Sequence, residues 1–165
     1  MNPLANEICA FVPKLRRYAF ALTGNRRWGD RYIEIVLEIL LEEPHRIRHG
    51  HDVRFKLYEL LHDVIGAVSI GTSEIDNEPD GFGSDDITRR RVLSLALVDR
   101  KVLLLVMVEG FELAQAAALV RLPLAQANAA LSRAVGKLSN GMAMPAASPR
   151  AGYVRSGPSE YAHAH

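Results

Sequence analysis

The sequence predicts an all-α protein made of two small helical bundles joined by an acidic linker. Apolar residues recur three and four positions apart over most of the chain, and the alternating pattern typical of strands is almost absent. Glycine and proline interrupt this pattern at intervals that suit short helices. We therefore expect helical bundles over residues 1–70 and 87–139, an acidic flexible linker over 71–86 and a disordered tail over 140–165.

Three helices are expected in the first bundle, over residues 4–22, 28–42 and 52–70. Pro13 should kink the first helix or begin a new first turn, because proline cannot donate a hydrogen bond to the preceding turn. Gly24 should end that helix. The apolar residues that share one face of the third helix are Phe55, Tyr58, Leu61, Val64, Ile65 and Val68.

The segment between the bundles, residues 71–86, differs in composition from its surroundings. It contains six acidic residues, three glycines and one proline, and no basic residue. Such a composition favours a solvated linker. The residues after 139 are mostly small and polar with interspersed prolines, which predicts a disordered tail.

Four shorter helices are expected in the second bundle, over residues 88–95, 99–109, 112–120 and 124–138. The run 102–108 is apolar on all sides and should therefore be buried. The last two helices have the spacing of a helix-turn-helix. The adjacent small residues Ala116 and Ala117 would allow two such helices to cross closely, although an ordinary helical hairpin fits the same spacing.

Composition excludes several classes of protein. Twenty basic and nineteen acidic residues leave a formal charge of +1, which argues against a generic polyanion binder. Cys9 is the single cysteine, so an intramolecular disulfide is excluded, and its apolar neighbours predict a small buried side chain. No apolar run approaches the about 20 residues that span a membrane, and the N-terminus lacks the basic start of a signal peptide. We therefore expect a cytoplasmic protein.

Several sequence segments resemble known transcription regulators. Residues 99–105 and 108–111, followed by Ala116 and Ala117, are similar to region four of extracytoplasmic-function sigma factors, and the N-terminal part is similar to region two. A closer resemblance is to the sigma-like domain of the PhyR family of general stress response regulators, and it covers about residues 5–139. The segments that carry it are residues 15–19, 22–24, 29–32, 37–38 and 57–58.

This resemblance implies one of two functions. A domain of the PhyR type binds an anti-sigma factor of the NepR type and so releases the true sigma factor. An extracytoplasmic-function sigma factor binds RNA polymerase and promoter DNA and initiates transcription. The PhyR family also carries a phosphorylatable receiver domain after the sigma-like part. Too few residues follow Leu138 for such a domain, so we expect either a shortened form of such a protein or a stand-alone mimic, with a separate receiver domain as a possible partner.

The residue types favour the first function. Promoter binding requires cations that face phosphates, yet the expected recognition helix offers Gln126 and Asn128 first, with Arg133 and Lys137 further on. These are the DNA-contacting candidates if the sigma-factor alternative holds, because Gln and Asn can bind adenine. The turn before them places Arg121 where glycine is usual, at a cost on the order of 1 kcal/mol if the backbone is left-handed. The end of the third helix also lacks basic residues that could track a DNA strand.

Protein binding is therefore expected, in which an amphipathic partner lays helices in apolar grooves on both bundles. Tyr58, Leu61, Phe111 and Leu113 are the candidate partner-binding residues, although the same residue types suit core packing. We expect no enzyme activity, no cofactor and no metal site, because no nucleophile constellation, nucleotide-binding motif or convincing ligand set is present. The acidic stripe Asp30, Glu34 and Glu38 is interpreted as a solvated face rather than a catalytic pair.

Overall fold

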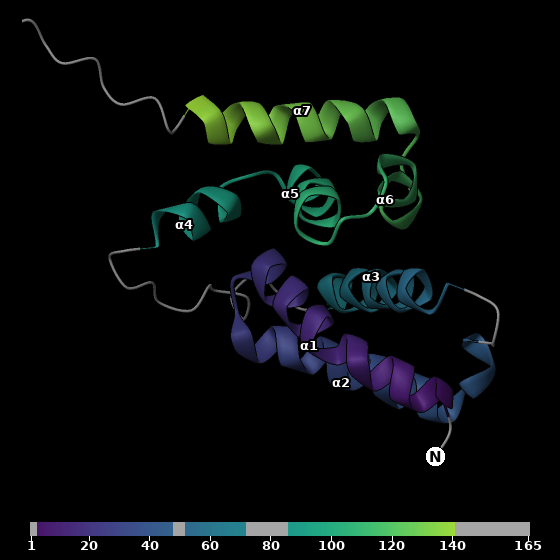
Figure 1. Ribbon diagram of the computed structural model, residues 1–165. Coiled ribbons are helices and arrows are strands. Elements are labelled where there is room, and N and C mark those ends of the chain that lie inside the picture. Colours follow the sequence, from purple (N-terminus) through teal and green to yellow (C-terminus); the bar gives the residue numbers. More distant parts are fainter. Residues whose placement is uncertain (1–2, 48–51, 72–85, 141–165) are drawn as a thin grey trace, which may run out of the picture.

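The computed structural model describes residues 3–47, 52–71 and 86–140. Every regular element in these ranges is a helix, which confirms the expected all-α fold. Figure 1 shows two layers, with α1, α2 and α3 in one and α4 to α7 in the other. The elements are α1 (Pro3–Thr23), α2 (Arg26–Glu42), the 3₁₀ turn η1 (Pro44–Arg46), α3 (Val53–Gly71), α4 (Ile87–Leu93), α5 (Leu97–Leu103), the π-helical turn η3 (Leu104–Val108), α6 (Leu113–Leu119) and α7 (Leu124–Asn140).

The first bundle is formed by α1, α2 and α3 around an apolar core. Helices α1 and α2 pack closely, and Gly29 sits where they meet, since a Cβ there would lie 3.3 Å from the backbone nitrogen of Phe20. The periodic apolar residues face inward, as expected from their spacing. Those whose side chains are almost completely buried are Leu15, Tyr18, Leu22, Tyr32, Val36, Leu57, Tyr58 and Leu61.

Local sequence signals set the helix ends of this bundle. Gly24 ends α1 with a φ of +73°, a left-handed conformation that glycine adopts without steric cost. The side chain of Asn25 begins α2 by accepting a hydrogen bond from the backbone nitrogen of Trp28 at 3.0 Å. Asp52 accepts one from the backbone nitrogen of Phe55 at 3.0 Å, at the start expected for α3.

Two features of the start of α1 differ from expectation. Helix α1 runs through Pro13 without a break, so the new first turn at this proline is wrong, while the alternative of a kink stays a prediction. Cys9 is exposed rather than buried. The physical reason is that the buried residues of α1 begin only at Leu15, so the first turns of the helix are covered on one side at most.

The second bundle contains the expected helix-turn-helix, formed by α6 and α7. Ala116 and Ala117 of α6 are buried, and so are Ala127 and Ala130 of α7. Because each of these side chains is a single methyl group, the two helices can cross closely. The turn between them holds Arg121 at a φ of 56°, so the left-handed conformation predicted for this residue is confirmed.

The apolar run at residues 102–108 is only partly buried. Val102 and Leu105 are inaccessible to solvent, but Met107 and Val108 are 66% and 50% exposed, so burial of the whole run was a wrong expectation. The helix changes to a π-helical turn at Leu104–Val108 and then ends, which leaves its last residues beyond the packed layers.

The two bundles share one hydrophobic core. Helix α3 packs against α6, and α1 packs against α4 and α5. The second-bundle residues that belong to the same buried cluster as the first bundle are Leu104, Leu105, Phe111, Ala116 and Leu119. Residues 72–85 and 141–165 lie outside the described residues, so the flexible linker and the disordered tail stay predictions. None of the helices in the described ranges is both long and apolar enough to cross a lipid bilayer.

The alanine contact between α6 and α7 gives a first testable prediction. Ala127→Leu should lower the free energy of unfolding by about 1–3 kcal/mol, because Ala127 is fully buried and the added carbons have no space. Ala129→Leu is the matched control, since Ala129 is exposed on the same helix and should change stability by less than about 0.5 kcal/mol. Urea denaturation measures both. Equal effects would show that the two helices do not cross closely.

Candidate protein-binding site

A buried carboxylate joins the two bundles. Glu109 lies in the loop after η3, and its side chain is only 2% exposed. The hydroxyl of Tyr58, on α3, donates a hydrogen bond to Oε2 of Glu109 at 2.6 Å. Nη2 of Arg17, on α1, donates to Oε1 at 3.3 Å. A carboxylate removed from water requires such charge-assisted bonds, so this contact holds three elements together.

The tyrosine is the neutral donor of this contact. Burial raises the pKa of Tyr58 far above its ordinary value of 10.0, and the hydrogen bond to the Glu109 carboxylate raises it further. The hydroxyl therefore keeps its proton throughout the physiological pH range and remains available to Glu109.

Phe111 follows two residues after the carboxylate and enters the first bundle. Its ring meets that of Tyr58 edge-on at a centroid distance of 5.0 Å. The guanidinium of Arg54 lies 3.9 Å from the centroid of the same ring, and it also donates a hydrogen bond to the backbone oxygen of Glu109. Gly110, with a φ of +71°, provides the turn that lets the acid and the ring both face inward.

A second buried polar contact lies behind this one. The hydroxyl of Tyr18 and Nε2 of His62 are 2.9 Å apart, and Tyr18 also meets Tyr58 edge-on at 5.3 Å. Burial, followed by the nearby charge of Lys101, lowers the pKa of His62 to about 3. His62 is therefore neutral near pH 7 and serves as a structural partner of the tyrosine.

Other arginines also bridge the bundles. Arg100 donates to the backbone oxygen of Leu22 at 2.6 Å, and Arg89 donates to that of Gly24 at 2.6 Å. Arg121 pairs with Asp63 of α3 at 2.5 Å, although both side chains are well exposed. These contacts fix the end of α1 and the middle of α3 against the second bundle.

The candidate partner-binding residues are mostly covered in this arrangement. Tyr58, Leu61 and Phe111 are buried, and Leu113 is half-buried beside the helix-turn-helix core. The structure brings Tyr58 and Phe111 into direct contact, whereas Leu113 packs in a separate cluster. Their role in partner binding stays a prediction. Sequence reasoning did not identify Arg54 and Glu109 as site residues, although Glu109 belongs to a segment that resembles sigma factors.

The residues proposed for DNA contact differ from one another in their surroundings. Gln126 and Asn128 are exposed on the first turns of α7. Arg133 instead donates to Oδ1 of Asp99 at 2.7 Å, and the Asp99 side chain is only 3% exposed. This hydrogen bond raises the pKa of Arg133. The charge of Arg133 is thus directed at α5 rather than outward.

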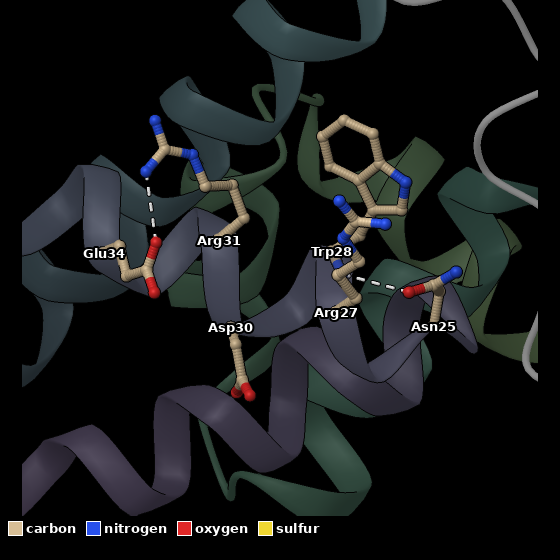
Figure 2. Close-up of a pocket in the computed structure, with 6 residues that line it drawn as sticks. All are labelled: Asn25, Arg27, Trp28, Asp30, Arg31 and Glu34. Carbon is tan, nitrogen blue, oxygen red and sulfur yellow. Dashed lines mark hydrogen bonds and ion pairs between the residues drawn. The ribbon is translucent and has the colours of Figure 1, made fainter.

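Figure 2 shows a pocket of about 650 Å³ at the start of α2. Its acids are already ion-paired: Asp30 accepts from Arg16 at 2.7 Å, and Glu34 accepts from Arg31 at 3.1 Å. The hydrogen bond from Arg16 lowers the pKa of Asp30, which keeps that carboxylate charged. This pairing suits a solvated face and leaves no free acid–base pair among the six residues that line the pocket. The lining residues are Asn25, Arg27, Trp28, Asp30, Arg31 and Glu34.

An apolar groove lies between the start of α1 and the end of α2, with a volume of about 420 Å³. Leu41 stands at this groove with 81% of its surface exposed. The other lining residues are Leu4, Ala5, Ile8, Cys9, Leu37, Leu40, Pro44 and Ile47. Among the residues that the structure describes, no group of three His, Cys, Asp or Glu side chains could hold a metal ion.

The buried histidine gives a pH prediction. Unfolded His62 has a pKa near 6.5 and folded His62 a pKa of about 3, so below pH 6.5 only the unfolded state binds this proton. The free energy of unfolding should therefore fall as the pH drops from 6.5 to 5, by up to about 1.4 kcal/mol per pH unit. His62→Gln should flatten this slope, whereas His45→Gln, on the exposed turn η1, should leave it unchanged. Urea titrations at several pH values measure it. An unchanged slope in the His62 variant would contradict the assignment.

Comparisons with known proteins show a partial similarity to the PhyR family. Residues 8–62 match the family model described as the Sigma2 domain of PhyR. The chain is 29% identical over 107 residues to the phyllosphere-induced regulator PhyR of Methylorubrum extorquens AM1; the match covers 65% of this chain and 38% of that regulator. That relative is named as a regulator.

Solved structures extend the likeness to both bundles. The structure of the PhyRSL–NepR complex from Sphingomonas sp. Fr1 matches with a TM-score of 0.70 at 23% identity, over 92% of this chain and 99% of that one. The sigma factor RpoE of Bartonella quintana, in complex with the anti-sigma factor NepR, also matches with a TM-score of 0.70, at 18% identity over 85% and 96% of the two chains. The chain therefore has the fold of these solved structures, and its residues 8–62 match the family model of the PhyR sigma2 domain.

Proposed function

We propose that this chain is a sigma-factor mimic that binds a small helical anti-sigma factor of the NepR type. Sequestration of the anti-sigma factor would release the true sigma factor by mass action, in stress-responsive transcription regulation. The observation that carries the proposal is a sigma-like fold whose recognition helix has few outward-facing cations. Helix α7 contains two basic residues, and one of them, Arg133, is bonded to Asp99.

The end of α3 supports the same function. Its basic residues, Arg54 and Lys56, lie in the first turns, and Arg54 is bonded within the protein to the loop at Glu109. Further along, the exposed Asp63 is ion-paired with Arg121, and α3 has no lysine or arginine after Lys56. A surface that lacks phosphate anchors provides neither affinity for DNA nor register on it.

The names of the structural relatives indicate which class of protein the partner belongs to. The Sphingomonas protein was solved in complex with NepR, and so was RpoE. A sigma factor and a mimic therefore share both the fold and the anti-sigma partner, and the fold alone does not separate them. In this chain, the groove beside Leu41 is apolar and accessible, and the apolar face of an amphipathic helix binds to such a groove.

The alternative is an extracytoplasmic-function sigma factor that binds RNA polymerase and promoter DNA. Gln126 and Asn128 favour it, because both are exposed on α7 and both can bind adenine. The chain spans 38% of the length of the curated regulator that it matches. Control by a receiver domain is a further part of the proposal.

A competition experiment tests the mimic function. A NepR-type anti-sigma factor is bound to its fluorescently labelled sigma factor, and the purified chain is added in increasing amounts. We expect an equimolar amount to displace most of the sigma factor. Gln126→Ala with Asn128→Ala is the control variant, which should displace it equally well because these side chains serve only the alternative function. Failure of the wild-type chain to displace the sigma factor would contradict the proposal.

DNA binding provides an independent test. Since α7 offers at most one cation free of an intramolecular partner, any promoter complex should be weak, and log K should fall against log salt with a slope shallower than about −2. Fluorescence anisotropy with a duplex promoter measures the slope, and addition of core RNA polymerase should give no transcription. A steep slope together with sequence-dependent initiation would establish the sigma-factor alternative.

A further inference from the structure

Five residues form the contact that closes the two bundles over the candidate partner-binding residues. We call this set the latch: Arg17, Arg54 and Tyr58 from the first bundle, and Glu109 and Phe111 from the second. The acid and the ring project from one short loop, and every bond that Glu109 receives crosses from one bundle to the other. Tyr58 and Phe111 are themselves two of the candidate partner-binding residues.

The chemistry of the latch differs from that of the surrounding core. Apolar contacts weaken gradually when two surfaces separate, but a carboxylate that is 2% exposed depends on its donors at fixed distances. Loss of one donor leaves a buried charge with less compensation, which favours separation of the surfaces and hydration of the acid. The latch therefore favours one relative position of the two bundles.

One member of the latch is accessible from outside. The Arg17 side chain is 59% exposed, although the carboxylate that it binds is buried. An acidic side chain on a partner helix can therefore bind Arg17 while the bundles are still closed. That competition would leave Glu109 with Tyr58 alone and so weaken the closed state.

We propose that the latch holds the partner-binding surface closed, and that an anti-sigma helix carrying a carboxylate beside an apolar residue opens it by taking Arg17 from Glu109. This inference rests on the proposed function, because it assumes that the partner uses Tyr58 and Phe111. Binding then selects the open arrangement, and the apparent affinity is reduced by the fraction of molecules that are closed.

Two neighbouring arginines provide a matched pair of variants. Arg17→Ala removes a donor that links the bundles, whereas Arg16→Ala removes one that links α1 to α2 within the first bundle, by its pairing with Asp30. The two arginines are exposed to similar extents, 59% and 55%, so neither variant should fail to fold. Each variant removes one positive charge from α1, so the two variants differ only in the carboxylate that loses its arginine.

Two measurements are made on each variant. The first is the distance between fluorescent labels on opposite layers, placed by Glu42→Cys on α2 and Ser132→Cys on α7 in a Cys9→Ser background; both positions are exposed. The second is the dissociation constant for the purified NepR-type anti-sigma factor. Arg17→Ala should lengthen the mean label distance and tighten apparent binding roughly fivefold, because an exposed ion pair between Arg17 and a partner carboxylate contributes less than the opening gains. Arg16→Ala should change neither.

The outcomes separate this inference from the proposed function. If Arg17→Ala leaves the label distance unchanged, the claim that the latch holds the bundles together is overturned, whatever the dissociation constant. A lengthened distance with unchanged or weaker binding overturns the claim that the latch covers the partner surface. If the wild-type chain does not bind the anti-sigma factor, the proposed function fails, and so does the claim about the partner surface. The label distances would then still decide whether the latch closes the bundles.

Discussion

The buried carboxylate of Glu109 is the constraint on which the arrangement of the two bundles depends. A negative charge that is 2% exposed is stable only where donors reach it, and its donors come from α1 and α3. The loop that carries it must therefore return to the first bundle, and it brings the ring of Phe111 with it. The shared apolar core supplies most of the attraction, while the carboxylate selects one relative position of the two layers.

Intramolecular pairing of charged side chains also explains how a sigma-like fold can lose its ability to bind DNA. Arg133 is bonded to Asp99, Arg54 to the loop at Glu109, and Arg100 to the backbone of Leu22. Each guanidinium stabilises the fold through an intramolecular bond, although the side chain of Arg133 is still 55% exposed. The surface also offers an apolar groove, which suits an amphipathic protein partner better than a duplex.

The candidate site was only half predictable from the sequence. Tyr58 and Phe111 were identified because large apolar side chains recur at helical spacing, and the structure places them in contact. Arg17 and Glu109 were not identified as a pair, because they are 92 residues apart and nothing local connects them. The burial of Met107 and of Cys9 was predicted wrongly for a related reason. An apolar side chain near a helix end is buried only if another element lies over it, which the local pattern does not encode.

Local information determined the helices themselves. Several features depend on only a few neighbouring residues, so the sequence alone could indicate them. They are the apolar spacing, the end of α1 at Gly24, the cap at Asp52 and the left-handed turn at Arg121. Only the tertiary structure decided that the bundles close on each other and cover Tyr58. The physical reason is that a buried ion pair depends on which surfaces exclude water, and that is fixed only when distant segments meet.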